Sequence, residues 1–201
     1  MSRRVGRRFF ERPALEVAPD LLNKVLVAPG VAGRIVETEA YQGADDPGSH
    51  AYRGVTPRTE VMFGPPGHLY VYFTYGMHWC ANVVTDRAGT PGAVLIRAVV
   101  PIRGIEAMRL RRSRARRDVD LANGPAKVAQ AFAIDGTHDG IDLTGAHLGV
   151  SIRDDGTAPP AIPAVGVRIG LSKGQDLPWR FAVPDCAEVS RPHPTTGHDA
   201  R

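Results

Sequence analysis

Side chains that could do acid–base chemistry alternate along one short segment of the sequence. In GRIVETEAYQG, residues 33–43, apolar and polar positions follow a period of two, which predicts a β-strand with Glu37, Glu39 and Tyr41 on one face. Neighbouring side chains on such a face are roughly 6 to 7 Å apart, so the two carboxylates could line one cleft or simply meet solvent. The same alternation puts Ile35 on this face, and on the opposite face Val36, Thr38 and Ala40.

A candidate partner for these carboxylates is Arg97, which lies in the apolar run AVLIRAVV. A guanidinium in such a strand needs a carboxylate if it is buried, because an unpaired buried charge is costly. A Glu–Arg pair that faces a cleft could hold and activate a water molecule.

Three of the five tyrosines fall in the segment LYVYFTYGMHWC, which predicts a β-hairpin with its turn at Tyr75 and Gly76. The ring of Tyr75 would stand at the apex, where the hairpin itself cannot bury it. It could pack on a neighbouring loop, or it could act as a wedge between DNA base steps. Alternation along the first strand predicts Leu69, Val71 and Phe73 in the core, and on the other side Tyr70, Tyr72 and Thr74.

The composition favours one domain with many turns and a locally basic surface. The 201 residues include 22 Gly and 17 Pro, and the formal charge is +4 with a pI of about 9.4. Six arginines fall within residues 109–117 and four within residues 1–8. Such clusters can bind a polyanion, but they can equally be a solvated helix face and a basic terminus.

Several classes of protein are not supported by the sequence. Cys80 and Cys186 are far apart and form no disulfide or zinc pattern, and the seven histidines show no ligand spacing. No run of 18 apolar residues and no signal-peptide core is visible, so we expect a cytoplasmic protein that does not enter a membrane. Motifs for nucleotide binding, zinc proteases and serine hydrolases are also missing from the sequence.

The remaining segments predict the elements that would position these residues. Residues 1–30 predict a short helical entry whose apolar side includes Val25 and Leu26. Residues 44–67, rich in Gly, Pro and Asp, predict a long ordered loop of the kind that often carries function. Further expected elements are a strand at 92–101, a helix within 105–117 and a turn followed by a helix at 123–134.

Four of these segments, taken in order, resemble the alkyladenine (3-methyladenine) DNA glycosylase family. They are residues 33–63, residues 67–84, residues 92–98 and residues 123–134, and the similarity runs from about residue 10 to 190. The resemblance implies an α+β fold: one mixed domain, residues 1–190, around a curved antiparallel β-sheet with surrounding helices and a protruding, DNA-intercalating β-hairpin. Residues 191–201 are expected to be a disordered tail.

The resemblance also implies roles for individual residues. Glu39 would be the general base that activates water, helped by Arg97 and by the backbone carbonyl near Ile169. Tyr41, His50 and Tyr72 would form the pocket around a flipped base. Asn82 would exclude normal guanine from the pocket. Tyr75 would intercalate into the duplex, with Gly76 and Met77 beside it, and Lys127 would contact a phosphate.

The function implied is a monofunctional DNA glycosylase of base excision repair. It would act as a monomer without cofactor or metal, flip alkylated and other damaged purines out of duplex DNA, and leave an abasic site. The aromatic cage would favour a positively charged alkylpurine by about 0.5 to 2 kcal/mol per cation–π contact. The source of acid for neutral lesions is not visible in the sequence.

Two other readings remain open at this point. One is a nucleic-acid-binding module without catalysis, against which the pairing of Glu39 with Arg97 argues. The other is a sugar hydrolase that uses Glu37 and Glu39 as acid and base, against which the basic clusters and the hairpin tyrosine argue.

Overall fold

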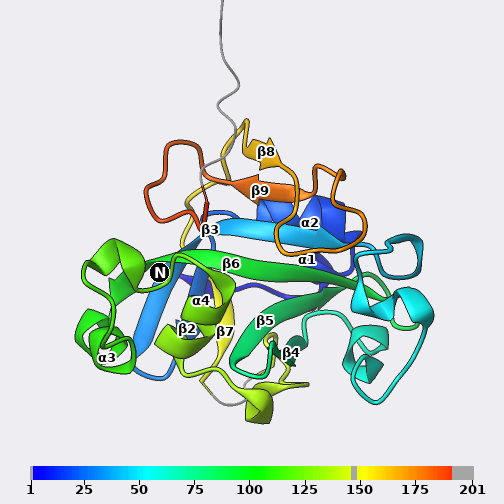
Figure 1. The fold of residues 1–201 in the computed structure, drawn as a ribbon, viewed down its shortest axis with the longest axis horizontal. Coiled ribbons are helices and arrows are strands. Elements are labelled where there is room, and N and C mark those ends of the chain that lie inside the picture. Colours follow the sequence, from blue (N-terminus) through cyan, green and yellow to red (C-terminus); the bar gives the residue numbers. More distant parts are fainter. Residues whose placement is uncertain (1, 146–148, 192–201) are drawn as a thin grey trace, which may run out of the picture.

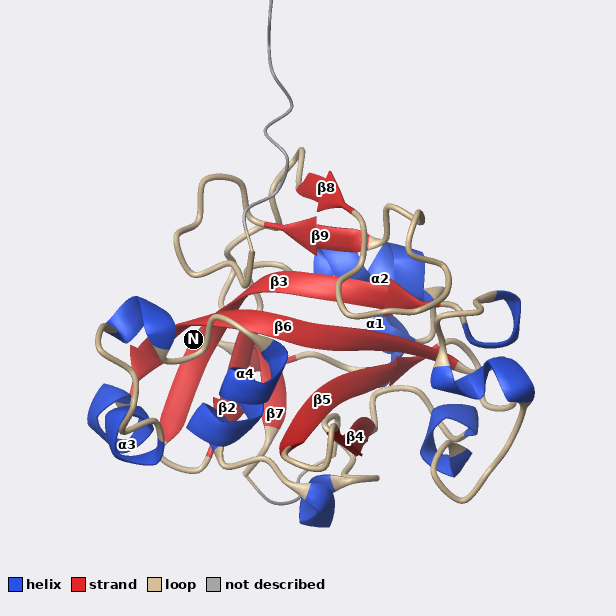
Figure 2. Ribbon diagram, viewed as in Figure 1, coloured by secondary structure: helices blue, strands red, loops and turns tan. Residues whose placement is uncertain are grey.

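The structure, a computed structural model, describes residues 2–145 and 149–191. Its described residues form one curled antiparallel sheet with a few short helices, which confirms the expected α+β class (Figures 1 and 2). The strand order is β1-β7-β2-β3-β6-β5-β4, and β9 joins β3 to β8. The strands are β1 (Arg3–Arg4), β2 (Val25–Ala28), β3 (Val31–Tyr41), β4 (Leu69–Thr74), β5 (His78–Thr85), β6 (Gly92–Arg103), β7 (Ser151–Asp154), β8 (Ala164–Gly166) and β9 (Arg180–Ala182).

Short helices surround this sheet. The α-helices are α1 (Arg7–Phe10), α2 (Ala14–Asp20), α3 (Ile105–Arg111) and α4 (Pro125–Phe132). The 3-10 turns are η1 (Gly43–Asp45), η2 (His50–Arg53), η3 (Glu60–Phe63), η4 (Asp118–Asp120) and η5 (Gly136–His138). The segment expected to be a long loop, residues 44–67, is thus ordered by turns η1 to η3.

Strand β3 is the central element, because it pairs with β6 along one edge and with β2 and β9 along the other. Its pairing with β6 shifts register between Ile35 and Glu37 and again between Glu37 and Thr38. Such β-bulges bend a strand and re-aim its side chains. The predicted alternation therefore holds only from Glu37 onward, and Ile35 packs in the main core with Ala40 instead of sharing the glutamate face.

Helices α2 and α4 hold the bent sheet in place. The hydroxyl of Thr38 donates to the carbonyl of Ala18 in α2 (2.9 Å), so this side of β3 faces α2 and the side with Glu37 and Glu39 faces away from it. Helix α4 begins with Pro125, as predicted, and buries Phe132 against the sheet. The first turn of α4 is thereby fixed beside the hairpin of β4 and β5.

One expectation about the start of the chain is wrong, and the one about its end stays a prediction. Val25 and Leu26 lie in β2 and not in a helix, since a short apolar run fits a buried strand as well as a helix. The expected tail, residues 191–201, lies outside the described residues except for Arg191, whose carbonyl accepts a bond from Arg180 (3.2 Å).

Candidate active site

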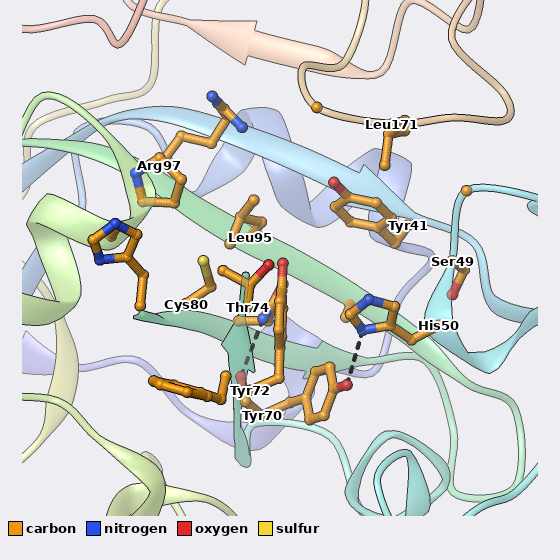
Figure 3. Close-up of a pocket in the computed structure, with 18 of the residues that line it drawn as sticks. Tyr41, Ser49, His50, Tyr70, Tyr72, Thr74, Cys80, Leu95, Arg97 and Leu171 are labelled. Carbon is orange, nitrogen blue, oxygen red and sulfur yellow. Dashed lines mark hydrogen bonds between the residues drawn. The ribbon is translucent and has the colours of Figure 1, made fainter. Parts of the chain in front are cut away.

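A cavity of about 530 Å³ lies where the end of β3, the β4–β5 hairpin, turn η2 and the start of α4 meet. Aromatic rings make up much of its wall, as Figure 3 shows: Tyr41 lies on one side, and Tyr70, Tyr72 and His50 lie on the other. Arg97 from β6 and Ile169 from the loop after β8 complete the side nearest Glu39. The structure therefore gathers the predicted residues from five separate segments.

The carboxylate of Glu39 lies directly behind this wall, with no exposed surface. Its Oε2 atom accepts the hydroxyl of Tyr41 (2.9 Å) and pairs with Nη1 of Arg97 (3.1 Å). Its Oε1 atom accepts the backbone N–H of Ile169 (2.7 Å). All three partners line the cavity, so only these hydrogen-bonded groups separate the carboxylate of Glu39 from a molecule in the cavity.

Burial and these contacts have opposite effects on the pKa of Glu39. Burial raises the pKa of its carboxyl above the ordinary value, because desolvation disfavours the charged form. Arg97, the N–H of Ile169 and the hydroxyl of Tyr41 each lower that pKa by stabilising the carboxylate. Glu39 is thus a buried carboxyl group whose charge depends on these three donors.

Glu37 is buried too, but its oxygens are held by the protein. Oε1 accepts Arg180 (2.9 Å) and the hydroxyl of Ser190 (3.0 Å), and Oε2 accepts the N–H of Ser190 (2.6 Å). Nε of Arg97 also lies 3.5 Å from Oε1. Arg180 and Ser190, unlike the partners of Glu39, do not line the cavity, so Glu37 fits an anchor for the C-terminal segment and not the second carboxylate of a sugar hydrolase.

The rings opposite Tyr41 pack against one another and share a hydrogen bond. His50 and Tyr72 pack edge to face with centroids 4.6 Å apart, and Tyr70 lies tilted against Tyr72 at 5.6 Å. The Nδ1 atom of His50 is 2.9 Å from the hydroxyl of Tyr70, the dashed contact in Figure 3. Burial, with a smaller effect of Arg58, lowers the pKa of His50 to about 4, so this ring is neutral at pH 7.

Two arginines lie against the cavity rings. The guanidinium of Arg168 is buried 4.8 Å from the centroid of Tyr41 and is paired with Asp46 (2.7 Å). Arg58 lines the cavity with its guanidinium 5.2 Å from the centroid of Tyr72. Two of the rings that line the cavity, Tyr41 and Tyr72, therefore already lie against a cation.

The hairpin apex has the geometry that the sequence suggested. Tyr75 and Gly76 both take positive φ, at 51° and 64°, and Tyr75 is 78% exposed while also lining the cavity mouth. A left-handed backbone is unfavourable for a bulky residue, so local turn stability does not explain this tyrosine. Met77 is also exposed, and Phe73 is 47% exposed against Trp79, which corrects its expected place in the core.

Three other predicted residues have well-defined places. Asn82 is buried in β5, lines the cavity and donates to the carbonyl of Tyr70 (3.1 Å). Ile169 meets Glu39 through its N–H, whereas the resemblance suggested its carbonyl. Lys127 lies in the first turn of α4, but its ammonium donates to Asn123 (2.7 Å), while Pro125 and Ala126 line the cavity.

Most arginines of the segment 109–117 are bonded to other groups of the protein. Arg109 pairs with Asp118 (2.7 Å) and Arg117 with Asp120 (3.0 Å). Arg112 donates to Gln130 (2.6 Å) and, with Arg114, borders a second hollow of about 490 Å³ beside the hairpin. The reading of a structural helix face thus fits much of this segment.

The described residues contain neither a metal-binding cluster nor a membrane-spanning helix. Within residues 2–145 and 149–191, no group of three or more His, Cys, Asp or Glu side chains is placed to hold a metal ion. Among the helices of these same ranges, none has the length and apolarity needed to span a bilayer.

Sequence reasoning missed the arginines that support the site, Arg58, Arg168 and Arg180. Arg180 follows Trp179 in the apolar segment LPWRFAV, and Arg168 lies between Val167 and Ile169. Each of these two, like Arg97, is a charge in an apolar segment and would need a carboxylate partner if it is buried. Arg58 lies in a polar loop, where the sequence gives no comparable signal.

The chain is similar to known proteins over most of its length. The sequence model of the family described as "Methylpurine-DNA glycosylase (MPG)" matches residues 8–187. A protein of Burkholderia lata named "Putative 3-methyladenine DNA glycosylase" is 60% identical over 92% of this chain and 90% of its own length. Proteins with the same name from Carboxydothermus hydrogenoformans and Streptomyces avermitilis are 49% and 50% identical, each over 92% of this chain, and over 97% and 89% of their own lengths. The chain therefore belongs to the methylpurine-DNA glycosylase family.

Proposed function

We propose that this protein is a monofunctional DNA glycosylase that flips damaged purines out of duplex DNA and hydrolyses the N-glycosidic bond. Membership of the methylpurine-DNA glycosylase family supports a hydrolase that acts on N-glycosyl bonds of alkylated purines. The observation that carries the finer proposal is the buried Glu39–Arg97 pair behind a cavity walled by aromatic rings. A purine fits such a wall by stacking, and a carboxylate at its edge fits attack on the sugar.

Recognition begins with the cost of removing the base from the duplex. A damaged base stacks and pairs less well, so its extrusion costs less than the few kcal/mol of a normal nucleotide. The extruded purine stacks between Tyr41 on one side and His50 and Tyr72 on the other. Asn82, fixed by its bond to the carbonyl of Tyr70, limits the room at the base edge.

The vacated position in the duplex is filled by Tyr75. Its exposed ring stands at a turn that the β4–β5 pairing holds in place, with Gly76 and Met77 beside it. An aromatic wedge of this kind separates base steps in proteins that enter the minor groove. The partner is therefore double-stranded DNA that contains a damaged base, with Lys127 near the helix start available to a phosphate.

Cleavage then uses Glu39 as the base. A water molecule beside Arg97 and the hydroxyl of Tyr41 can donate a hydrogen bond to the Glu39 carboxylate, since each carboxylate oxygen accepts more than one hydrogen bond. As the C–N bond breaks, the electron pair leaves with the purine and the sugar becomes cationic, which the negative charge of Glu39 stabilises. Water adds to the sugar carbon, its proton passes to Glu39, and an abasic site remains.

The experiment that tests this function uses end-labelled duplexes, each with one lesion. We expect the protein to release 7-methylguanine or hypoxanthine, so that alkali then cleaves the labelled strand at that position. Without alkali the strand should stay intact, because no lysine lines the described cavity to form a Schiff base. Cleavage without alkali, or no release of either base, would contradict the proposal.

A further inference from the structure

Tyr41 and Tyr72, two rings of the cavity wall, are not free to act as a cage for a cation. Arg168 lies 4.8 Å from the centroid of Tyr41, and Arg58 lies 5.2 Å from that of Tyr72. A guanidinium at these distances already uses the electron-rich face or polarises the ring from behind. The cation–π preference for positively charged alkylpurines that the sequence suggested is therefore weakened at both rings.

The charge of the cavity wall also disfavours a cationic purine. Among the described residues that line the cavity, Arg58 and Arg97 are the charged side chains, and none is Asp or Glu. The nearest carboxylate, that of Glu39, is buried behind the wall and already paired with Arg97. His50 contributes no negative charge either, so a cationic base meets a wall of net positive charge.

The two arginines on the rings differ in their freedom. Arg168 is fully buried and fixed by Asp46 and by the carbonyl of Ala40 (3.0 Å). Arg58 is exposed and lies in the polar segment between η2 and η3, with its Nη2 atom 3.4 Å from Nε2 of His50. No ion pair joins it to a carboxylate in the part of the chain that the structure describes. Arg58 therefore has donors available for a molecule in the cavity.

From this geometry we propose that Arg58 is a specificity-determining residue that sorts lesions by charge and favours neutral purines over cationic ones. The inference rests on the proposed glycosylase function. A neutral purine that leaves with the electron pair of the C–N bond becomes anionic, and a guanidinium at the base stabilises that charge as it develops. A cationic purine leaves as a neutral molecule, so Arg58 opposes its binding, and bond cleavage only relieves this repulsion without any net attraction.

The test compares the wild-type protein with Arg58→Gln, Arg58→Lys and the control Arg53→Gln. Arg53 is an exposed arginine of the same loop region that does not line the cavity. Single-turnover release is measured over a range of protein concentrations from duplexes with one hypoxanthine, which is neutral, or one 7-methylguanine, which is cationic. The quantity compared is kmax/K1/2, because it includes the repulsion that a cationic base meets on binding. Loss of the Arg58 charge should lower the ratio of hypoxanthine to 7-methylguanine release by about tenfold or more.

The remaining variants make the result decisive. Arg58→Lys should keep more of the wild-type ratio than Arg58→Gln does, and Arg53→Gln should leave the ratio unchanged. An equal fall in both rates for Arg58→Gln would identify a simple phosphate contact and overturn the inference, as would an unchanged ratio. If the wild type releases 7-methylguanine but no hypoxanthine, the inference fails while the proposed function stands. Release of neither base overturns both.

Discussion

Two glutamates on one strand face have different surroundings because their partners differ. Glu37 is saturated by Arg180 and Ser190, whose bonds tie the C-terminal segment to β3. Glu39 is bonded only to groups that also line the cavity, so its charge is available there. The sequence showed that both carboxylates share a face and suggested Arg97 as a partner. It could not show Arg180, Ser190 or the N–H of Ile169, which come from the C-terminal part of the chain.

The contact between Tyr41 and Glu39 predicts a pH effect. A carboxyl with a raised pKa ionises only at higher pH, so the rate of 7-methylguanine release should rise with pH through the pKa of Glu39. The hydroxyl of Tyr41 lowers this pKa, and Tyr41→Phe removes it while keeping the ring. The midpoint of the pH–rate profile should therefore move to higher pH.

Single-turnover rates from pH 4 to 9 measure this shift. Tyr72→Phe is the matched control, because it also removes a hydroxyl from a cavity ring but not one bonded to Glu39. The protonation of His50, whose pKa is about 4, lies at the lower end of this range. A midpoint that moves downward in Tyr41→Phe, or equally in both variants, would refute the role given to this hydrogen bond.

At the scale of elements, period-two patterns predicted β3, β4 and the hairpin turn, because each strand has one polar face. They failed where tertiary structure sets the geometry. The bulge in β3 moves Ile35 into the core, and no local pattern encodes it. Phe73 continues the apolar alternation of β4, but the hairpin extends past the core at that point and leaves the ring half exposed.

The hairpin turn itself yields a prediction of opposite effects on stability and activity. Asn tolerates the left-handed backbone better than Tyr does, so Tyr75→Asn should raise the free energy of unfolding by up to about 1 kcal/mol. The same change removes the proposed wedge and should weaken lesion-specific binding and base release. Urea unfolding and release assays on one preparation measure both effects. Normal lesion preference in this variant would show that Tyr75 does not fill the gap in the duplex.

Over the whole molecule, the clustered arginines suggested a polyanion partner, but their total number overstates the charge available to DNA. Arg109 and Arg117 are neutralised by Asp118 and Asp120. Arg114, by contrast, is exposed beside the hollow that adjoins the hairpin. The sequence could show the cluster, whereas only the fold shows which of its charges face outward without a carboxylate.

The salt dependence of DNA binding tests this division. Replacing Arg114 and Arg116 together by Gln should reduce the slope of log binding constant against log salt by up to about 2, since each phosphate contact contributes roughly 0.9. The matched pair Arg109→Gln and Arg117→Gln should change the slope much less, because those charges are already balanced. Equal changes in the two double variants would mean that the ion pairs open on DNA.

The most direct test of the account is the rate of base release by Glu39→Gln. This change keeps the shape of the side chain and can keep bonds to Tyr41 and Ile169, but it removes the base and the negative charge. Release of 7-methylguanine in a single turnover should fall by about a hundredfold or more, while binding to the lesion-containing duplex persists. Release at the wild-type rate would contradict the central claim that Glu39 activates the attacking water.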